Sequence, residues 1–417
     1  MIQDEVKIIC QKAKAASYQA ACLSSDVKNS ILKTASKLII DNIDNIILEN
    51  DKDIKAAKEN NLEVAKIDRL KLDKERIEGI ASSINSIIDL SDPVGEVTYE
   101  NARPTGINVK RVRTAIGVLL TIYESRPNVT SDVSALCLKS GNVAILRCGS
   151  DSIYSSTIIA NLYRQALIEH NVDENIVTLI SNTDRNYVSE LLKQEKYIDI
   201  VIPRGGKSLI QAIMQNTKIP VIKHLDGNCH TYIHEDADAI KAVNITHNAK
   251  LRRVGICGAT ESLIIDKKVV NEILPLIVQK LTKDGCEVRG DAISKSLCAE
   301  ITLATAEDFY TEYLDKIISV KVVENIEEAI KHINEHSSSH TESIITENTN
   351  AASKFLNEID SANVMHNTST QFADGGEFGL GAEVGISTGK LHARGPVGLE
   401  QLTTYKYQVV SDCATRK

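Results

Sequence analysis

Tryptophan is absent from this chain, and aromatic residues make up only 4% of it. Proteins that bind single-stranded nucleic acid usually stack bases on aromatic side chains within a basic groove. The formal net charge of −8 also disfavours a nucleic-acid partner. No apolar run approaches the length of a membrane-spanning helix, and residues 1–5 carry no apolar signal segment. We therefore expect a cytoplasmic protein with no nucleic-acid partner and no membrane partner.

The nine cysteines form no recognisable disulfide or metal pattern, because their number is odd and CxxC pairs are lacking. Extracellular disulfide scaffolds and zinc ribbons usually show such pairing. His332, His336 and His340 do recur at four-residue steps, as metal ligands on one helix face would. The serines at 337–339 should end that helix first, however, so we expect reduced thiols and no metal.

The remaining composition is that of a globular protein, and 417 residues are enough for two or three domains. Short apolar runs alternate with helical patterns, which predicts βαβ units and parallel sheets. Two segments, 107–113 and 401–409, instead alternate apolar with polar residues, as exposed strands do. We expect the buried strands at 116–122, 143–146, 176–180, 198–202, 220–222, 262–265, 318–323 and 343–346.

One cysteine, Cys229, lies in a polar run that follows the apolar segment 219–222. Lys223, His224 and His230 are close to it in sequence, and such neighbours lower a thiol pKa and favour the nucleophilic thiolate. We therefore predict that Cys229 is a nucleophile. The alternative is a buried small hydrophobe, which most free cysteines are.

The turn Arg204-Gly205-Gly206-Lys207 predicts an anion site, because it follows an expected strand and opens an expected helix. Backbone N–H groups and the helix N-terminus would face the same anion, and Arg204 or Lys207 can add a full charge. This suits a nucleotide phosphate. A P-loop would need another glycine where Val201 stands, and a plain tight turn is the alternative.

Two further loops follow expected strands. In one, Arg147 and Ser150 can hold an adenosine ribose or its 2′-phosphate, and a solvated arginine is the alternative. In the other, Arg126 can clamp a carboxylate or phosphate, and the amide of Asn128 can donate to a developing oxyanion. Equally, Asn128 can simply cap the next helix.

Taken together, these segments resemble the gamma-glutamyl phosphate reductase (glutamate-5-semialdehyde dehydrogenase) family of the aldehyde dehydrogenase superfamily. The resemblance implies an α/β fold with a Rossmann-type cofactor domain, an α/β catalytic domain and a small β extension for oligomer contacts. We expect the cofactor domain at 1–100 and 115–226, the catalytic domain at 227–390, and the extension at 101–114 and 391–417. The runs that carry the resemblance are 122–130, 202–207, 223–230, 374–383 and 390–396.

The resemblance implies an NADPH-dependent oxidoreductase of proline biosynthesis. It would reduce L-glutamyl 5-phosphate to L-glutamate 5-semialdehyde through a cysteine thioester and release phosphate. The implied partners are a second copy of the chain, as a homodimer or higher homo-oligomer, and glutamate 5-kinase through functional coupling. The alternative is a related aldehyde dehydrogenase acting on another aldehyde or acyl donor, with phosphate or CoA, or a catalytically weak paralogue.

The resemblance also implies roles for individual residues. The implied catalytic residues are Cys229 and Asn128, and the implied substrate contacts are Ser125, Arg126, His230 and Arg394. The implied cofactor residues are Arg147, Ser150, Arg204, Gly205, Gly206, Lys207 and Glu312. Some positions depart from the usual family pattern, which has Thr-Gln at Leu251-Arg252, Pro at Val254, Asn at Gly258, Arg at Gln371 and Gly at Cys148. The lost cation at Gln371 is expected to weaken recognition of an anionic group.

Overall fold

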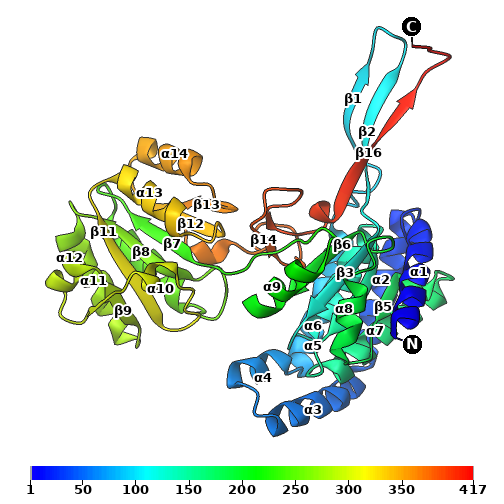
Figure 1. Cartoon of the computed structure of the whole chain (residues 1–417), viewed down its shortest axis with the longest axis horizontal. Helices are drawn as coiled ribbons and strands as arrows, with labels where there is room; N and C mark the ends of the chain where they lie inside the picture. The colour runs from blue at the N-terminus through cyan, green and yellow to red at the C-terminus, as the bar shows by residue number, and fades with distance from the viewer. Residues whose placement is uncertain (1, 417) are drawn as a thin grey trace. The chain divides into compact units, whose positions relative to one another are not determined.

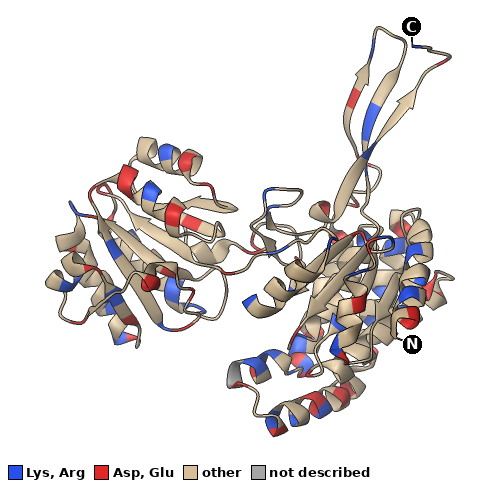
Figure 2. Ribbon diagram, in the orientation of Figure 1, with Lys and Arg blue, Asp and Glu red and all other residues tan. Residues whose placement is uncertain are grey.

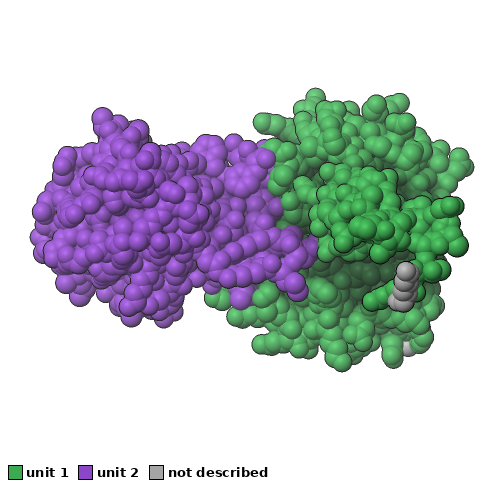
Figure 3. All heavy atoms as spheres, turned by 90° about the horizontal axis from the view of Figure 1, so that it is seen from above, with its two compact units in different colours: residues 1–223, 379–385, 397–417 green, residues 224–378, 386–396 purple. Residues whose placement is uncertain are grey.

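The computed structural model describes residues 2–416, apart from the side chains of residues 64 and 65. Contacts between residues divide the chain into two compact units (Figure 3). Unit 1 comprises residues 1–223, 379–385 and 397–417, and unit 2 comprises residues 224–378 and 386–396. The predicted catalytic segment 227–390 therefore differs from unit 2, which also contains 224–226 and 391–396 but lacks 379–385, which pack in unit 1. The functional roles predicted for these segments stay predictions.

Unit 1 is built on a parallel sheet in the order β5-β4-β3-β6. Every residue of β3 and β4 is buried, which explains why continuous apolar runs predict them. The order reverses at β3, since β4 and β5 lie on one side of it and β6 on the other (Figure 1). Sheets of this kind bind ligands at the carboxyl ends of the strands beside such a switch point. The strands are β3 (Val118–Tyr123), β4 (Val143–Cys148), β5 (Val177–Leu179) and β6 (Ile200–Arg204).

Helices surround this sheet and account for the amphipathic pattern of the first ninety residues. The apolar repeat between Ile31 and Ile47 belongs to two helices, because Asn42 ends α2 and precedes α3. Figure 2 shows acidic and basic residues interspersed along α3, as expected of a solvated helix face. The helices are α1 (Ile2–Ala20), α2 (Ser25–Asp41), α3 (Ile43–Glu59), α4 (Val64–Leu70), α5 (Lys74–Asp89), α6 (Asn128–Lys139), α7 (Ile153–Glu169), α8 (Arg185–Leu191) and α9 (Lys207–Asn216).

A separate antiparallel sheet extends from unit 1 (Figure 1). Its strands are β1 (Val97–Ala102), β2 (Asn108–Ala115) and β16 (Thr403–Val410), in the order β1-β2-β16. The register pairs Thr403 with Ala115 and Val410 with Asn108, so both predicted exposed strands are confirmed and they are partners of each other. We refer to this three-stranded sheet as the β extension.

Unit 2 contains a seven-stranded parallel sheet in the order β10-β9-β11-β8-β7-β12-β13. One apolar core lies between this sheet and helices that include α10 and α11, and a second lies between the sheet and α13 and α14. The strands are β7 (Cys229–Ile233), β8 (Thr260–Asp266), β9 (Glu287–Gly290), β10 (Thr302–Leu303), β11 (Ile317–Val323), β12 (Thr341–Ile345) and β13 (Asn363–His366). The helices are α10 (Ala239–Leu251), α11 (Val270–Lys283), α12 (Ala292–Leu297), α13 (Ile326–His336) and α14 (Thr349–Glu358).

Several elements differ from the sequence-based expectation. The run 220–222 forms only a single bridge, between Val221 and Val201, and not a strand. The strand of that region begins later, at Cys229, within a run that is polar in sequence. Helix α10 was not expected, because its buried face is made of small and polar residues. Among the described residues, every helix is too short or too polar to cross a membrane. The predicted α/β class, with parallel sheets and a β extension, is confirmed.

Candidate active site

Most predicted cofactor residues lie at the carboxyl ends of the unit 1 strands. The register places Tyr123, at the end of β3, between Cys148 of β4 and Arg204 of β6. The backbone N–H of Glu124 donates to the carbonyl of Arg204 at 3.2 Å, which ties two of these strand ends together. The loops that carry Ser125, Ser150 and Gly205 therefore begin from one edge of the sheet, beside the switch point.

The turn between β6 and α9 has the form expected of an anion site. Gly206 is the N-cap residue of α9, and the helix then runs for ten residues from Lys207. A Cβ at Gly205 would meet the Glu124 carboxylate at 2.7 Å, whereas a Cβ at Gly206 would meet nothing within 4 Å. The first turn of α9 thus opens onto free space beside Gly206. The phosphate site predicted at this turn stays a prediction.

The predicted cofactor residue Arg147 is an internal group in this structure. Its side chain is buried, and its guanidinium donates to the backbone carbonyls of Cys148 and Thr183, the latter at 2.7 Å. These bonds fix the loop after β4. The predicted contact of Arg147 with a ribose stays a prediction, and it would require the side chain to share its donors.

The predicted oxyanion donor, Asn128, is the first residue of α6 and is exposed. Its amide nitrogen donates to the carboxylate of Asp132 at 2.9 Å. Burial raises the pKa of that carboxyl to about 6, although the bond from Asn128 and the charge of Arg204 both lower it. An amide has two N–H groups, so one donor of Asn128 is committed to Asp132. Nearby, the Ser125 hydroxyl donates to Asp151, at a backbone φ of 50°.

Residues of unit 2 gather at the amino ends of three neighbouring strands. Cys229 opens β7 and pairs in register with Thr260, which opens β8. On the other side, His230 pairs with Glu342 of β12, so Thr341 lies beside Cys229. The segments that precede these strands, which carry His340 and Cys257, are therefore brought together.

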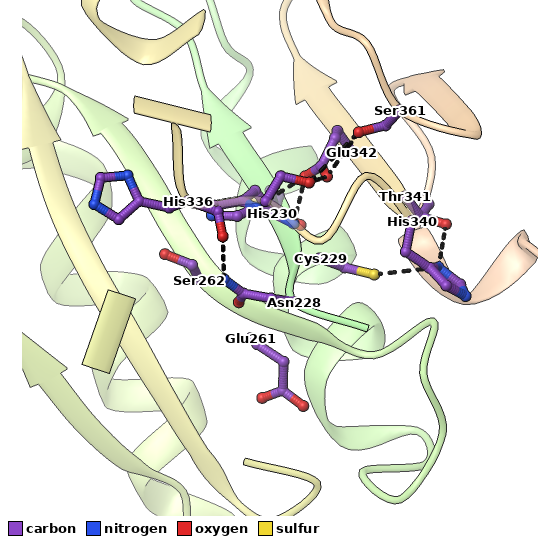
Figure 4. A network of polar contacts seen from close by, with 12 residues as sticks. Asn228, Cys229, His230, Glu261, Ser262, His336, His340, Thr341, Glu342 and Ser361 are labelled. Carbon is purple, nitrogen blue, oxygen red and sulfur yellow. Dashed lines mark hydrogen bonds and ion pairs between the residues drawn. The ribbon is translucent and has the colours of Figure 1, made fainter. Parts of the chain in front are cut away.

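The thiol of Cys229 is an internal group, and Figure 4 draws its contact with His340. Its side chain is 0% exposed, and its sulfur donates to the carbonyl of Cys257 at 3.1 Å and lies 3.6 Å from His340 Nδ1. Burial, followed by the charge of Glu342, raises the pKa of Cys229 well above its ordinary value. The prediction that its sequence neighbours lower this pKa is therefore wrong. A neutral, enclosed thiol does not meet the needs of a nucleophile.

The sequence reasoning missed Cys257, which is the partly exposed thiol of this region. Ligand atoms of Cys257, His224 and His340 all lie within 4.8 Å of one another. His224 therefore lies beside Cys257, which is distant from it in sequence. A signal was present, since Cys257 lies in a glycine-containing loop that follows two arginines and precedes a buried strand.

The loop that carries Cys257 is held by close backbone contacts. A Cβ at Gly227 would lie 2.1 Å from the carbonyl oxygen of Cys257 and 2.7 Å from its Cα. A Cβ at Gly258 would lie 3.3 Å from the carbonyl oxygen of Thr370. The main chain at Cys257 is thus packed between two other segments, which positions its sulfur without large freedom.

His230 is not a substrate contact in this structure, which corrects the prediction. Its side chain is 0% exposed, and both its ring Nδ1 and its backbone nitrogen lie within 2.9 Å of Glu342 Oε2. Glu342 also accepts from Ser337 and Ser361 (Figure 4). This network joins β7 to β12 inside the unit. The repeat of three histidines is also divided, because α13 ends at His336 and His340 lies beyond it.

Two predicted residues of unit 2 have partners within the unit. Arg394 donates to the carboxylate of Asp360 at 2.7 Å and to its carbonyl at 2.8 Å. Glu312 lies between Tyr310 and β11, and its charge raises the pKa of both Cys229 and Glu261. The roles predicted for Arg394 and Glu312 stay predictions.

Gln371, which stands where the family usually has Arg, is hydrogen bonded to Arg252, a second position that differs from the family pattern. The Arg252 guanidinium donates to the side-chain oxygen of Gln371 at 3.0 Å, while the Gln371 amide donates to the carbonyl of Ala249 at 2.8 Å. Gln371 is 4% exposed, whereas Arg252 is exposed. A guanidinium therefore does lie beside position 371, although residue 371 itself carries none.

Comparison with known proteins gives a consistent set of relatives. Residues 2–288 and 306–407 match the model of the aldehyde dehydrogenase family. The chain is similar to the gamma-glutamyl phosphate reductase of Caldanaerobacter subterraneus subsp. tengcongensis, with 46% identity over 99% of this chain and 100% of that one. It is also similar to the gamma-glutamyl phosphate reductase of Erythrobacter litoralis, with 49% identity over 94% of this chain and 93% of that one.

Solved structures give the same picture. The crystal structure of gamma-glutamyl phosphate reductase from Thermotoga maritima is similar at a TM-score of 0.97 and 43% identity, covering 99% of this chain and 100% of that one. A glyceraldehyde-3-phosphate dehydrogenase from Methanocaldococcus jannaschii, solved in complex with NADP, shares the fold at a TM-score of 0.70 but only 16% identity, covering 98% of this chain and 95% of that one.

Proposed function

The chain belongs to the aldehyde dehydrogenase family and, within it, to the gamma-glutamyl phosphate reductases, and on this premise we propose that it makes L-glutamate 5-semialdehyde for proline biosynthesis. The substrate is L-glutamyl 5-phosphate, an acyl phosphate, and the second product is inorganic phosphate. The observation that carries the chemistry is the partly exposed thiol of Cys257 beside the imidazoles of His224 and His340.

Cys257 is the proposed nucleophile in place of Cys229. A nucleophilic thiol must meet its substrate and lose its proton, and an adjacent imidazole can take that proton. Cys257 has both the exposure and the imidazoles, whereas Cys229 has neither exposure nor a lowered pKa. The Cys229 thiol instead donates to the Cys257 carbonyl, so its proposed role is to hold the nucleophile loop.

The cofactor is proposed to be NADPH, held by unit 1. The turn at Gly205-Gly206 and the first turn of α9 fit a phosphate, with Arg204 and Lys207 as cations. Ser150 and Arg147 are proposed for the adenosine ribose side, and Glu312 for the other ribose. Bound NADPH supplies the hydride that reduces the acyl group.

The proposed reaction proceeds through covalent bonds to Cys257. Its thiolate attacks the acyl carbon of the substrate, a carbon–sulfur bond forms, and the bond to the phosphate oxygen breaks. Hydride reduction gives a hemithioacetal, whose carbon–sulfur bond then breaks to release the aldehyde and restore the thiolate. Each tetrahedral oxyanion needs fixed donors, for which the amide of Asn128 is the proposed side chain. Ser125, Arg126 and Arg394 are proposed substrate contacts, with Arg252 as a further cation beside Gln371.

The test compares two single substitutions, Cys257→Ser and Cys229→Ser. Turnover is followed as NADPH oxidation and phosphate release with enzymatically generated glutamyl phosphate. We expect Cys257→Ser to lower kcat by a factor on the order of 10³ or more, because a hydroxyl is a far weaker nucleophile. Cys229→Ser keeps a donor at the same place and should retain most of its activity. Full activity of Cys257→Ser, or loss confined to Cys229→Ser, would contradict the assignment.

The acyl acceptor is tested in the oxidative direction. With glutamate 5-semialdehyde and NADP, the proposed enzyme requires inorganic phosphate and gains nothing from CoA. Turnover with CoA but not with phosphate would instead support an acylating aldehyde dehydrogenase of another substrate class.

The proposal has three further parts. They are a homodimer formed through the β extension, a cytoplasmic location and functional coupling to glutamate 5-kinase. The first of these rests on exposed strands and is argued as a prediction in the Discussion. The coupling has a chemical reason, since an acyl phosphate is easily hydrolysed and must be supplied close to where it is used.

A further inference from the structure

Two imidazoles from distant parts of unit 2 lie beside the proposed nucleophile. His224 belongs to the first residues of the unit, Cys257 to the loop before β8, and His340 to the residue before β12. Their ligand atoms lie within 4.8 Å of one another, and the two imidazole rings are 5.4 Å apart at 72°. Two imidazoles and a thiol are a ligand set that zinc prefers.

His224 is oriented as a metal ligand would be. Its Nδ1 lies 2.9 Å from the carbonyl oxygen of Ile386. A carbonyl only accepts, so Nδ1 carries the proton and Nε2 carries the lone pair. Metal-bound histidines usually donate their second ring nitrogen to a backbone carbonyl or carboxylate in this way, which fixes both the tautomer and the ring.

His340 has the corresponding arrangement in the interior of the unit (Figure 4). Its Nδ1 lies 2.8 Å from the hydroxyl of Thr341 and 3.6 Å from the sulfur of Cys229. Both contacts engage the same ring nitrogen, so Nε2 is the atom that can act as a ligand. His340 is fully buried and directly precedes the central strand β12, so its ring is held by the fold.

The spacing of the three groups suits a small soft cation. Zinc binds nitrogen at about 2.0–2.1 Å and sulfur at about 2.3 Å in a tetrahedron, which places neighbouring ligand atoms roughly 3.3–3.8 Å apart. The observed limit of 4.8 Å lies above that range, so the ligand atoms must move closer together when zinc binds. Calcium and magnesium prefer oxygen ligands, so they are poor candidates here.

We propose that His224, Cys257 and His340 form a reversible zinc site that inhibits the enzyme by occupying its nucleophile. Three protein ligands leave the fourth position of the tetrahedron to water or another small ligand. Zinc binding forms a metal–sulfur bond and releases the thiol proton, and no oxidant or reductant is needed. The inhibition rests on the proposed role of Cys257, whereas the binding does not.

A second group, His234, Glu235 and Asp236, carries no such proposal. The three residues are consecutive, and Asp236 is exposed. Glu235 also forms an ion pair with Lys268, so one of the three carboxylate or imidazole groups is already paired with a cation.

Zinc binding is measured directly on the reduced full-length protein, by competition with a chromophoric chelator in the presence of a phosphine reductant. We expect one tight site per chain, and a loss of affinity of about tenfold or more in each of His224→Ala, His340→Ala and Cys257→Ser. The control is the double variant Cys22→Ser/Cys413→Ser, which removes two exposed thiols elsewhere and should leave the tight site intact. Unchanged affinity in the three ligand variants, or loss in the control, would show adventitious binding only and overturn the proposal.

Because His340→Ala opens a buried position, a second measurement uses the unaltered protein. Zinc should slow alkylation of Cys257 by iodoacetamide, followed by peptide mass spectrometry, without slowing alkylation of Cys22. Magnesium should give no protection. Equal alkylation of Cys257 with and without zinc would contradict the site even if the variants were unstable.

Turnover then separates the two proposals. Zinc should inhibit NADPH-dependent reduction with the affinity measured by competition, and a chelator should restore it fully. Tight binding at these ligands with a catalytically dispensable Cys257 would leave the metal site standing but would remove the proposed nucleophile and, with it, the proposed inhibition. Turnover that depends on Cys257 without tight zinc binding would support the proposed nucleophile and overturn the zinc site.

Discussion

At the scale of single residues, Gly227 decides where the proposed nucleophile lies. The Cβ of an alanine there would stand 2.1 Å from the Cys257 carbonyl oxygen, and this neighbour is backbone rather than a flexible side-chain end. We expect Gly227→Ala to displace the Cys257 loop, destabilise the protein by about 1–3 kcal/mol and lower kcat. Urea unfolding and steady-state turnover check this.

The matched control for that change is Gly79→Ala. Gly79 lies exposed inside α5, and a Cβ there would meet nothing within 4 Å. Alanine restricts the unfolded chain and favours the helix, so this variant should gain about 0.4–1 kcal/mol and keep its activity. If Gly227→Ala also proved neutral, the close packing of the nucleophile loop would be disproved.

The two cysteines show what residue chemistry can and cannot be predicted from a sequence. The segment 223–230, which the sequence predicts to be part of a reactive region, supplies His224 to the group that contains Cys257. The sequence could not reveal that Cys229 opens a central strand, where its neighbours enclose it, or that the folded chain brings Cys257 to His224. Proximity in sequence was therefore a poor guide to the groups that set the pKa of the thiol.

At the scale of elements, a buried ion pair joins α10 to β8. Lys250 and Glu261 are both 0% exposed and hydrogen bonded, and Glu261 also accepts from the backbone nitrogen of Leu314 at 3.2 Å. Burial raises the pKa of Glu261 to about 7, although Lys250 lowers it. The pair thus fixes the end of α10, from which the loop to Cys257 departs.

Breaking this pair from one side should cost more than removing both charges. We expect Lys250→Met to destabilise the protein by about 3–5 kcal/mol, because it leaves a buried carboxyl without its cation. The double variant Lys250→Met/Glu261→Gln should recover most of that loss, since the remaining amide can still accept from Leu314. Urea unfolding of the two variants measures the difference. A double variant as unstable as the single one would show that the charges themselves hold α10.

Two elements that the sequence failed to predict, α10 and β7, share a physical reason. Helix α10 buries Ala242, Thr246, Ala249 and Lys250, a face with no large apolar side chain to give a helical repeat. Strand β7 buries His230 and Thr231, whose polar groups are bonded to Glu342 and Thr260 on the neighbouring strands. Such partners come from the folded sheet, whereas β3 and β4 are visible as apolar runs because their burial needs no partner.

At the scale of the whole molecule, alternation of strands and helices was sufficient to predict the α/β class, but not the path of the chain between units. The segment 379–385 returns to unit 1, where Gly381 lies against Leu90. The next segment, 386–396, belongs to unit 2, where the paired strands β14 (Ile386–Ser387) and β15 (Gly395–Pro396) lie. Contacts between residues so far apart leave no periodic signal in a single sequence.

The β extension offers the surface on which a second copy is expected to assemble. β16 is an edge strand, and each of its residues after Thr403 is exposed. Tyr405, Tyr407 and Val409 alternate along one face, with exposed fractions of 54%, 59% and 56%, and the two tyrosine rings lie 5.8 Å apart. An exposed apolar edge of this kind is usually covered by another chain.

The double variant Tyr407→Lys/Val409→Lys should therefore shift the protein from a homo-oligomer towards single chains, because it places charges where apolar side chains would be buried. Light scattering and sedimentation velocity at several concentrations give the molar mass. The control, Ile240→Lys, replaces an exposed apolar residue on α10 and should leave the mass unchanged. An unaltered protein that sediments as single chains, or a double variant with an unchanged assembly, would rule out the β extension as the interface.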